Sequence, residues 1–430
     1  MIDIKFIRQN KEKVERAIKN KGIKVDVDRL LKKDEERREL LTEIEQKRSE
    51  QKKTADREKA KRLKNEISVS KKLLSETETE FNALLSNVPN LPAEDVKVGK
   101  DESENEIIKT VGEKTKFDFS AKGRRRSIAL ATEREPASGW KPQDHLAIGE
   151  RLDLIDVKRA AKTSGARFGY LKNEAVLIQF ALVRLALDIL TKEKFKPMIP
   201  PVIVTGDSMK AMGYLEHGGE EETYHFEKDD IYFVGTSEQS IGPMHQNEIL
   251  NAKDLPLRYV SYSTCFRREA GSYGKDVKGI LRVHQFDKVE MFCFTKPEDS
   301  DQEHQYLLSL EEKLMQLLEI PYQVVKMCTG DLGNPAARKF DIEAWMPGQN
   351  QYRETHSTSN CTDFQARRLN IKYRNEKTGQ NEFVHTLNGT AFAMGRTIIA
   401  ILENYQQKDG SIKIPSVLEP YLGGAKEIRR

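Results

Sequence analysis

The sequence predicts an α+β protein with an N-terminal antiparallel α-helical coiled-coil arm and a larger domain built on an antiparallel β-sheet flanked by helices. Residues 25–86 hold neither proline nor glycine, which favours long helices. Farther along, strand-like runs recur with few helical stretches between them, which favours antiparallel pairing over βαβ units. The chain has no GxGxxG and no Walker loop, which disfavours a Rossmann or P-loop nucleotide site.

Composition narrows the class of protein further. The 430 residues are enough for two domains, and the formal net charge of +4 is nearly balanced, so a nucleic-acid contact would need a local basic patch. The four cysteines form no CxxC pair, which disfavours a disulfide framework and a cysteine zinc site. No run of about 18 apolar residues and no apolar signal core is present. We therefore expect a cytoplasmic protein without a membrane partner.

Residues 27–88 have the pattern of a coiled coil. A thin apolar stripe marks the first half and a seven-residue repeat the second, at Leu30, Leu31, Leu40, Leu41 and Ile44, then Ile67, Leu74, Phe81 and Val88 with Leu84. Around residues 52–64 the stripe nearly vanishes and Lys and Arg outnumber acids. We expect the chain to reverse there, giving two helices of about 28 residues and an arm about 40 Å long. Such an arm suits either dimerisation or contact with RNA phosphates.

Residues 257–294 predict a long hairpin with one chemically rich face. Alternation along a strand puts polar and charged side chains together, namely Tyr259, Ser261, Ser263, Cys265, Arg267 and Glu269 in the first run, and Arg282, His284, Phe286, Lys288 and Glu290 in the second. Leu281, Val283, Val289 and Met291 fall mostly on the other face. Arginine forks suit phosphates and an aromatic ring can stack on a base. A surface hairpin with paired charges is the alternative.

Three motifs resemble those of one enzyme family. FRREAGSYGKDVKGILRVHQFDKVE, residues 266–290, resembles motif 2 of the class II aminoacyl-tRNA synthetases, in the form found in seryl-tRNA synthetases. NGTAFAMGRTIIAILENYQ, residues 388–406, resembles motif 3, and FKPMIPPVIV, residues 195–204, resembles motif 1 with Pro201 at the motif proline. Similar flanks extend this resemblance over nearly the whole chain.

The resemblance implies a fold and a reaction. The fold would be a tRNA-binding domain at residues 1–115, with the arm at about 27–88, followed by a class II catalytic domain at 116–430. The reaction would be ATP-dependent activation of L-serine to seryl-adenylate and its transfer to the 3′ end of tRNA(Ser), with tRNA(Sec) left open. Mg²⁺ would be the cofactor, ATP a substrate and the assembly a homodimer, with Leu190–Val204 at the interface. The arm would recognise the long variable arm of the tRNA.

The resemblance also assigns roles at the nucleotide. Arg267 would bridge the α-phosphate and the amino-acid carboxylate, and Arg396 would bind the triphosphate at a helix N-terminus; both would be catalytic. Glu269 would face the adenine amino group and Phe286 would stack on adenine. The full ATP-binding set is Arg267, Arg268, Glu269, Val283, His284, Gln285, Phe286, Glu354, Thr355, His356, Ser357 and Arg396. Glu354 and Ser357 would hold Mg²⁺, and their opposite strand parity requires the backbone to bend.

A serine pocket needs buried hydrogen-bonding groups, because apolar fit rejects glycine and alanine poorly. The resemblance supplies Thr236, Ser237, Glu238, Arg267, Glu290, Asn388 and Thr390. The chain departs from the family pattern twice. It reads TSEQS at 236–240 where many relatives read TAEVP, and RETHSTSN at 353–360 where many read REISSCSN. We expect the His356 that this introduces to be a polar neighbour and not a catalyst.

Residues 120–140 separate two stretches that family members usually join, FDF and KPQDHLAIGE. This insertion, with Arg124, Arg125 and Arg126, would be a surface loop or an RNA contact. Two other functions remain for the whole chain: an enzyme of the same fold that loads a carrier protein, or a non-catalytic RNA-binding protein. The long arm argues against the first. The presence of Arg267, Glu290 and Arg396 argues against the second.

Overall fold

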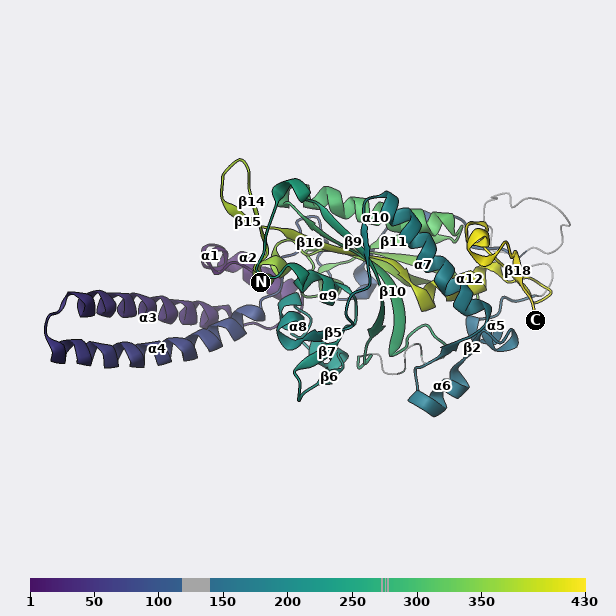
Figure 1. Ribbon diagram of the computed structural model, residues 1–430. Coiled ribbons are helices and arrows are strands. Elements are labelled where there is room, and N and C mark those ends of the chain that lie inside the picture. Colours follow the sequence, from purple (N-terminus) through teal and green to yellow (C-terminus); the bar gives the residue numbers. More distant parts are fainter. Residues whose placement is uncertain (118–139, 272–273, 275, 277) are drawn as a thin grey trace. The chain divides into compact units, whose positions relative to one another are not determined.

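The computed structural model describes residues 1–117, 140–271, 274, 276 and 278–430. The expected insertion at 120–140, with its three arginines, lies outside the described residues apart from Trp140. The chain forms two compact units, Met1–Pro92 and Ala93–Arg430 (Figure 1). None of the helices in the described part of the chain is long and apolar enough to cross a membrane.

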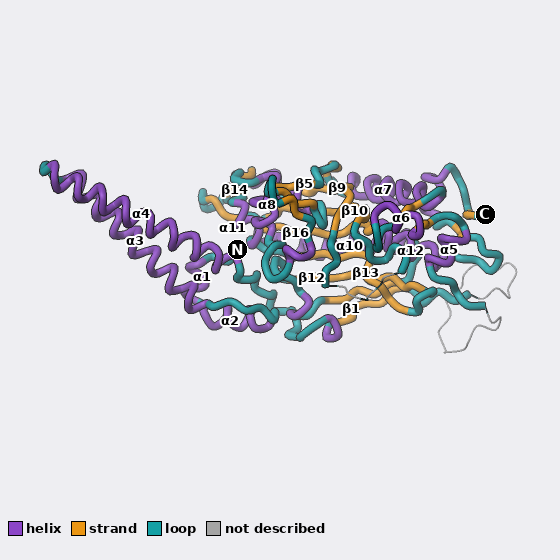
Figure 2. The backbone as a smooth tube through the Cα atoms, turned by 90° about the horizontal axis from the view of Figure 1, so that it is seen from below, coloured by secondary structure: helices purple, strands orange, loops and turns teal. Residues whose placement is uncertain are grey.

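The first unit is helical. Two short helices, α1 (Ile4–Gln9) and α2 (Lys11–Asn20), precede two long ones, α3 (Val27–Lys53) and α4 (Arg57–Ser86). The long helices run side by side and reverse through Thr54–Asp56 (Figure 2). The 27 residues of α3 span about 40 Å at 1.5 Å per residue. The predicted antiparallel arm and the place of its reversal are therefore confirmed.

The seam between the long helices explains why they pair. Along α4, buried side chains recur at steps of three, four or seven residues, which is the spacing of a coiled-coil seam. They are Leu63, Ile67, Ser70, Thr77, Phe81 and Leu85. Opposite them Leu30 and Ile44 are buried, while Leu41 of the predicted stripe is exposed. At the base of the arm, Leu30, Phe81 and Leu85 share a small core with α1 and α2.

The boundary between the units comes at Pro92 and not at residue 115. Residues 93–115 belong to the second unit because β1 (Glu106–Val111) adds an edge strand to its sheet by pairing with β11 (Tyr322–Lys326). The Ala93 amide also donates to the Ala337 carbonyl at 2.8 Å. The sequence did not predict this strand pairing, because the residues between Pro92 and Thr115 are mostly polar.

An eight-stranded sheet forms the second unit, in the order β1-β11-β12-β13-β16-β10-β9-β4. All neighbours are antiparallel except β4 and β9, which confirms the predicted class. The strand bounds are β12 Arg338–Met346, β13 Gln351–Asn360, β16 His385–Ala393, β10 Gln285–Thr295, β9 Leu257–Phe266 and β4 Lys196–Met198.

The two faces of the sheet differ. On one face Val289, Met291 and Cys293 of β10 enter the main core, with the helices α7 (Glu174–Lys192), α10 (Ser300–Leu317) and α12 (Met394–Tyr405) packed on the strands. On the other face, Phe292 and Phe294 share a second core with α8 (Gly206–Met212) and α11 (Phe364–Leu369). Lys288 and Glu290 lie on this second face, beside a cavity.

Short elements complete the second unit. They are β2 Ile155–Asp156, β3 Tyr170–Leu171, β5 Ile203–Thr205, β6 His225–Phe226, β7 Ile231–Phe233, β8 Ile249–Leu250, β14 Lys372–Arg374, β15 Asn381–Phe383, β17 Ile412–Lys413 and β18 Glu427–Ile428, with the helices α5 His145–Arg151, α6 Val157–Ser164 and α9 Glu238–Ile241.

Candidate functional site

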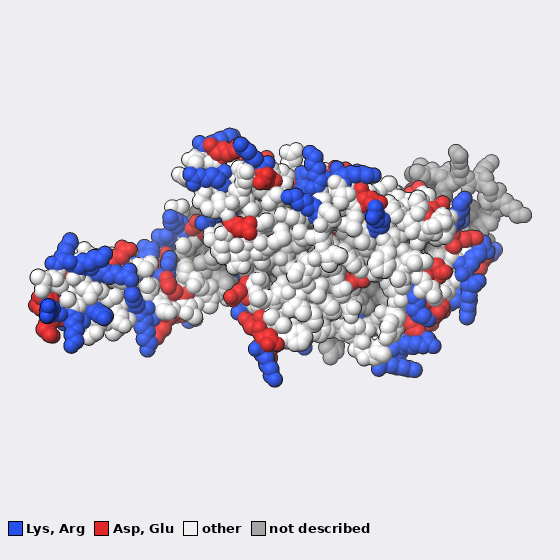
Figure 3. Space-filling model, in the orientation of Figure 1, with Lys and Arg blue, Asp and Glu red and all other residues white. Residues whose placement is uncertain are grey.

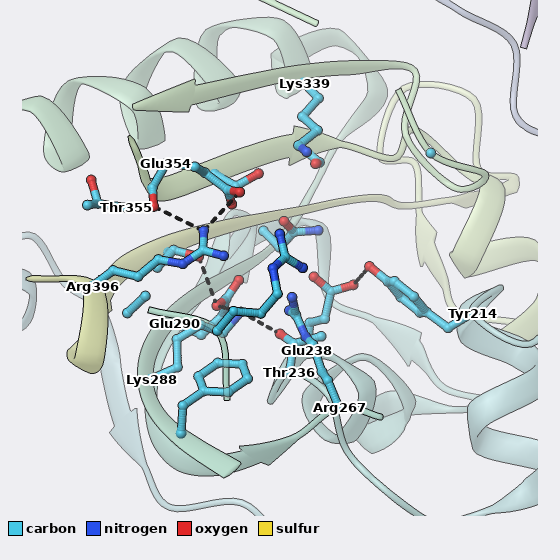
Figure 4. Close-up of a pocket in the computed structure, with 18 of the residues that line it drawn as sticks. Tyr214, Thr236, Glu238, Arg267, Lys288, Glu290, Lys339, Glu354, Thr355 and Arg396 are labelled. Carbon is cyan, nitrogen blue, oxygen red and sulfur yellow. Dashed lines mark hydrogen bonds and ion pairs between the residues drawn. The ribbon is translucent and has the colours of Figure 1, made fainter. Parts of the chain in front are cut away.

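A cavity of roughly 270 Å³ opens on the second face of the sheet. Its walls come from β10, β12, β13 and β16, from the starts of α9 and α12, and from the loops after β9 and before β12. Figure 4 shows the charged side chains that point into it. The residues lining it include thirteen of the predicted site: Thr236, Glu238, Arg267, Glu269, Val283, Phe286, Glu290, Glu354, Thr355, Ser357, Asn388, Thr390 and Arg396.

The hairpin of β9 and β10 brings an arginine over an aromatic ring. Phe286 pairs with Cys265 in the register of the two strands, so Arg267 follows just beyond the end of β9. Its guanidinium carbon lies 5.2 Å from the centre of the Phe286 ring, and its Nε donates to the Gly235 carbonyl at 3.1 Å. Arg282 Nη1 donates to Glu269 at 2.6 Å. A planar base and a phosphate could thus be met by neighbouring groups.

Strand alternation fails just before β10. The strand begins at Gln285, and residues 281–284 are irregular. Leu281 and Val283, predicted to face away, therefore line the cavity. His284 was predicted to share the charged face. Instead, its Nδ1 donates to the Arg267 carbonyl at 3.0 Å, and its ring lies 5.3 Å from that of Phe168.

The small end of the cavity collects buried charges. Lys288 Nζ donates to Thr236 Oγ1 at 2.8 Å and forms an ion pair with Glu290. Thr390 Oγ1 lies 3.4 Å from the same Glu290 carboxylate. All four side chains are at most 6 % exposed. Buried groups of this kind discriminate strongly between small polar ligands, because a ligand without matching polar atoms leaves them unpaired.

Glu238 is the second acid at this end. The Tyr214 hydroxyl donates to its carboxylate. Burial, with the nearby Glu290 adding to it, raises the pKa of Glu238 to about 7, although Tyr214 and Lys288 pull the other way. A ligand that brings a positive charge would stabilise the ionised form.

A β-bulge resolves the parity problem of Glu354 and Ser357. In the pairing of β12 with β13, Ile342 faces His356 while the next residue, Glu343, faces Glu354. Thr355 is thus the extra residue, and its hydroxyl turns to the Ile342 carbonyl at 3.2 Å. Both Glu354 and Ser357 consequently line the cavity. The predicted bend in the backbone is confirmed.

The other end of the cavity holds side chains of opposite charge, Glu354 with Arg396 and Lys339. Burial alone would raise the pKa of Glu354, but Arg396 and Lys339 outweigh it and lower that pKa to about 2. Glu354 and Ser357 offer only oxygen atoms, as a hard cation such as Mg²⁺ prefers. Between β12 and β13, Asp341 Oδ1 is buried and lacks a hydrogen-bond partner. The oxygen atoms of Glu354, Ser357 and Asp341 fit a magnesium ion, and Arg396 and Lys339 beside them fit the phosphates that such an ion would accompany.

Five predicted residues do not line this cavity. Ser237 is fully buried and its hydroxyl lies 2.7 Å from that of Ser261. Arg268 is held through its amide, which donates to the Glu222 carbonyl at 2.9 Å, and His284 turns away as described. Gln285 lines an adjoining cavity behind Phe286. His356 lies on the face of the sheet that packs on the main core, with its ring 5.8 Å from that of Phe392. Burial lowers the pKa of His356 to about 4.

Several lining residues lay outside the predicted set. They are Tyr214, Ile280, Leu281, Arg282, Lys288, Leu332, Gly333, Pro335, Ala336, Lys339, Ser359, Cys361, Ala393 and Gly395. For Lys288 and Arg282 the signal was present, since alternation along the hairpin placed them on the charged face. Ser359 follows Ser357 by two residues, which is also a strand signal. Tyr214 lies in the loop after α8 and Lys339 near the start of β12, and no spacing between these two segments could reveal that they meet.

Comparisons with known proteins agree with the motifs. Residues 223–405 match the family described as tRNA synthetase class II core domain (G, H, P, S and T), and residues 1–57 match the seryl-tRNA synthetase N-terminal domain. The serine--tRNA ligase of Dictyoglomus turgidum is 44% identical over 445 aligned positions, covering 100% of this chain and 99% of that protein. The serine--tRNA ligase of Nitrosopumilus maritimus is 40% identical, with 100% of both chains covered.

Solved structures are similar over the full length. The seryl-tRNA synthetase from Pyrococcus horikoshii complexed with ATP is 42% identical, with a TM-score of 0.88 and coverage of 100% of this chain and 99% of that one. The cytoplasmic serine-tRNA ligase from Naegleria fowleri in complex with AMP is 33% identical, with a TM-score of 0.87 and the same coverage. With this fold, these motifs and this extent of identity, the chain belongs to the seryl-tRNA synthetase family of class II aminoacyl-tRNA synthetases.

Proposed function

We propose that this chain is an ATP-dependent ligase that activates L-serine as seryl-adenylate and transfers the seryl group to the 3′ end of tRNA(Ser). One observation carries the proposal: a single cavity joins an arginine-rich end, suited to ATP, to a small buried end lined by Thr236, Glu238, Glu290 and Thr390. ATP and AMP are named as ligands of two similar structures. The proposed substrates, ATP and tRNA, place the activity in the cytoplasm.

At the nucleotide end, Arg267 and Arg396 neutralise phosphate charge. Adenine stacks on Phe286 beside Val283, and its amino group faces Glu269. Arg396 stands in the first turn of α12, where the helix dipole also favours an anion. Mg²⁺ would be held by Glu354 and Ser357 with phosphate oxygens, and it would supply charge neutralisation at the phosphates.

At the small end, the substrate ammonium group lies between Glu238 and Glu290. The serine hydroxyl reaches Glu290 and Thr390, and Asn388 closes the same wall. Arg267 orients the carboxylate toward the α-phosphorus. Lys288, which holds Thr236 and Glu290 in place, was outside the predicted set and belongs to this pocket.

The reaction needs no protein nucleophile. The serine carboxylate attacks the α-phosphorus and pyrophosphate leaves; a ribose hydroxyl of the terminal tRNA adenosine then attacks the activated carbonyl and AMP leaves. Alignment and charge neutralisation by Arg267 and Arg396 supply the catalysis. The other residues predicted for the ATP-binding and serine-binding sets would act by shaping the backbone around this cavity. They are Arg268, His284, Gln285, His356 and Ser237.

The arm is the proposed contact for the tRNA. Residues 52–64 hold seven Lys or Arg and two acids, at the end where α3 and α4 reverse. Lys and Arg side chains extend along the arm surface (Figure 3), where they can meet phosphates without reading bases. The long variable arm of tRNA(Ser) is the proposed target, and tRNA(Sec) is a second substrate to be assayed.

A homodimer is the proposed assembly. On α7, Leu177 and Phe180 are each 56% exposed, and Ile199 beside β4 is 83% exposed. Phe180 and Leu177 line a shallow groove with Tyr421 and Leu422. Large apolar side chains gathered in this way mark an interface, and a second copy of the chain is the proposed partner.

The deciding experiment is ATP–pyrophosphate exchange with each of the twenty amino acids, followed by charging of tRNA(Ser), tRNA(Sec) and a tRNA without a long variable arm. We expect exchange with serine and little else, and charging of tRNA(Ser). Stronger exchange with threonine or alanine than with serine would refute the assignment. Serine loaded onto a carrier protein but onto no tRNA would favour the carrier-protein alternative.

A further inference from the structure

His145, the first residue of α5, is buried to 5% exposure and touches two elements that are far apart in the sequence. Its amide donates to Glu403 Oε1 at 3.1 Å, and its ring Nδ1 lies 3.4 Å from the same oxygen. On the other side, the Ile280 amide donates to His145 Nε2 at 3.3 Å. Because Nε2 accepts, this hydrogen-bond pattern assigns the neutral tautomer that carries its proton on Nδ1.

Glu403 holds the ring firmly. It is fully buried near the end of α12. Besides the His145 amide, its carboxylate accepts from the Gly348 amide at 2.9 Å and from Gln349 Nε2 at 3.3 Å. Because several donors hold this buried carboxylate in place, its contact with Nδ1 fixes the orientation of the His145 imidazole.

The segment that His145 holds is a wall of the nucleotide end. Ile280 and Leu281 both line the cavity. The Leu281 carbonyl accepts from Arg396 Nε at 3.4 Å. Gly279 takes a left-handed φ of 72°, and a Cβ there would stand 1.9 Å from His145 Nε2. The close approach of ring and backbone therefore depends on glycine at this position.

These contacts connect residues 280–281 to two side chains on one face of α12. Arg396 and Glu403 are seven residues apart on α12, which places them on the same side of the helix about 10 Å apart. Residues 280–281 are tied to Arg396 through the Leu281 carbonyl and to Glu403 through the His145 ring. The position of Arg396 and the position of the cavity wall at residues 280–281 therefore both depend on α12.

We propose that His145 is a positioning residue for ATP, which acts through Ile280 and Leu281 and is itself oriented by Glu403. This proposal rests on the proposed use of the cavity for ATP. His145 does not line the cavity, so its loss should alter the shape of the nucleotide end. The serine end, which α9, β10 and β16 line, should stay unchanged.

The test compares three substitutions that separate the two contacts. His145→Gln keeps an acceptor within reach of the Ile280 amide, His145→Asn keeps a polar group beside Glu403 only, and His145→Leu removes both. We expect the KM for ATP in pyrophosphate exchange, and the Kd for ATP by calorimetry without serine, to rise about tenfold in His145→Asn and His145→Leu but less than about threefold in His145→Gln. The KM for serine should change less than about twofold.

Gln349→Ala is the matched control, because it removes another donor to the same Glu403 oxygen without touching Ile280. It should leave ATP affinity unchanged. Wild-type ATP affinity in His145→Asn, or equal rises of both KM values, would overturn the proposal; so would a Gln349→Ala variant that matches the asparagine variant. If His145→Leu fails to fold, the asparagine and glutamine variants still decide. If the wild-type chain shows no serine-dependent exchange, the proposed function fails, while ATP calorimetry still tests His145.

Discussion

Arg396 holds Glu354 twice: its Nη1 lies 2.9 Å from the carboxylate Oε2 and donates to the backbone carbonyl at 3.0 Å. The pair joins the first turn of α12 to β13 across the cavity (Figure 4). A triphosphate entering between them would find one positive and one negative group already in place. Little reorganisation is then needed when charge builds on the phosphates.

The first prediction follows from this pair. Arg396→Ala and Arg267→Ala should each lower the rate of serine-dependent exchange by about 10²–10³, because each removes a preorganised cation from the phosphates. Both variants should keep the circular dichroism and oligomeric state of the wild type, since both side chains lie at a cavity and not in the core. Near-normal exchange in either variant would remove that arginine from the site.

The second prediction concerns the buried acid of the small end. Glu290→Ala should reduce kcat/KM for serine by about 100-fold, on the order of 3 kcal/mol, because the substrate loses a buried charged partner and Lys288 loses its carboxylate partner. The KM for ATP should change little. Glu290→Gln keeps the size of the side chain and one acceptor, so its kcat/KM for serine should lie between those of the wild type and of Glu290→Ala. A variant that loses ATP and serine equally would point to collapse of the cavity instead.

The third prediction is a pH dependence set by Glu238. Its pKa of about 7 belongs to the empty pocket, and the ionised form is needed to accept an ammonium group. The kcat/KM for serine, which reports the free enzyme, should therefore fall about fivefold between pH 7 and pH 6. Glu238→Gln should lower kcat/KM and abolish this inflection. A profile that stays flat from pH 8 to pH 5.5 would contradict the assignment.

Glu238 also affects the stability of the fold, and in the opposite direction: activity needs the ionised carboxylate, while stability favours the protonated one. The folded pKa is raised from 4.5 to about 7, so the protonated form stabilises the fold. That contribution is fully present below pH 4.5 and is lost as the pH rises through 7, up to about 3 kcal/mol. Between pH 4.5 and pH 7, Glu238→Gln should therefore gain stability relative to the wild type. Denaturant unfolding of both proteins at several pH values measures the difference.

The fourth prediction separates the arm from the chemistry. A shortened arm tests this, and the structure decides where to cut it. Leu30 and Phe81 belong to the small core with α1 and α2, so these residues should be kept. Arg37 and Glu78 face each other across the seam, with 3.7 Å between Nη1 and Oε1. Replacing residues 38–77 with a short glycine-serine turn should leave that core and serine-dependent exchange intact.

The same variant should charge tRNA(Ser) far more slowly, and the affinity of the intact chain for tRNA should fall steeply with salt. A full deletion of residues 28–86 should also keep exchange but destabilise α1 and α2. Full charging by the shortened protein would mean that the arm is a structural coil. Charging of a tRNA without a variable arm serves as the comparison.

The fifth prediction tests the apolar surface of α7. Phe180→Glu places a charge in the proposed interface and should convert the dimer to a monomer, because an unpaired charge is costly to bury. Ile249→Glu is the control, since Ile249 is 58% exposed but lies elsewhere, on β8. Light scattering after size-exclusion chromatography gives the masses. A wild-type monomer, or a dimer that survives Phe180→Glu, would exclude this face.

Local pattern determined much of this protein. Heptad spacing and the absence of proline and glycine specified α3 and α4, because side-chain periodicity along a helix depends on neighbours three and four residues away. Alternation along β10 placed Lys288 and Glu290 on the cavity face and Val289 and Met291 in the core. The motifs identified Arg267, Phe286 and Arg396, whose positions follow from strand ends and a helix start.

Tertiary structure alone decided the rest. The bulge at Thr355 belongs to the pairing of β13 with β12, two strands whose register depends on the whole sheet. It turns Glu354 and Ser357 to the cavity and His356 away from it. Tyr214, Lys339 and the His145–Glu403 contact join segments that are far apart in the chain, and residues 93–115 complete a sheet whose next strand begins at Tyr322. Long-range pairing sets these contacts, and no sequence spacing records it.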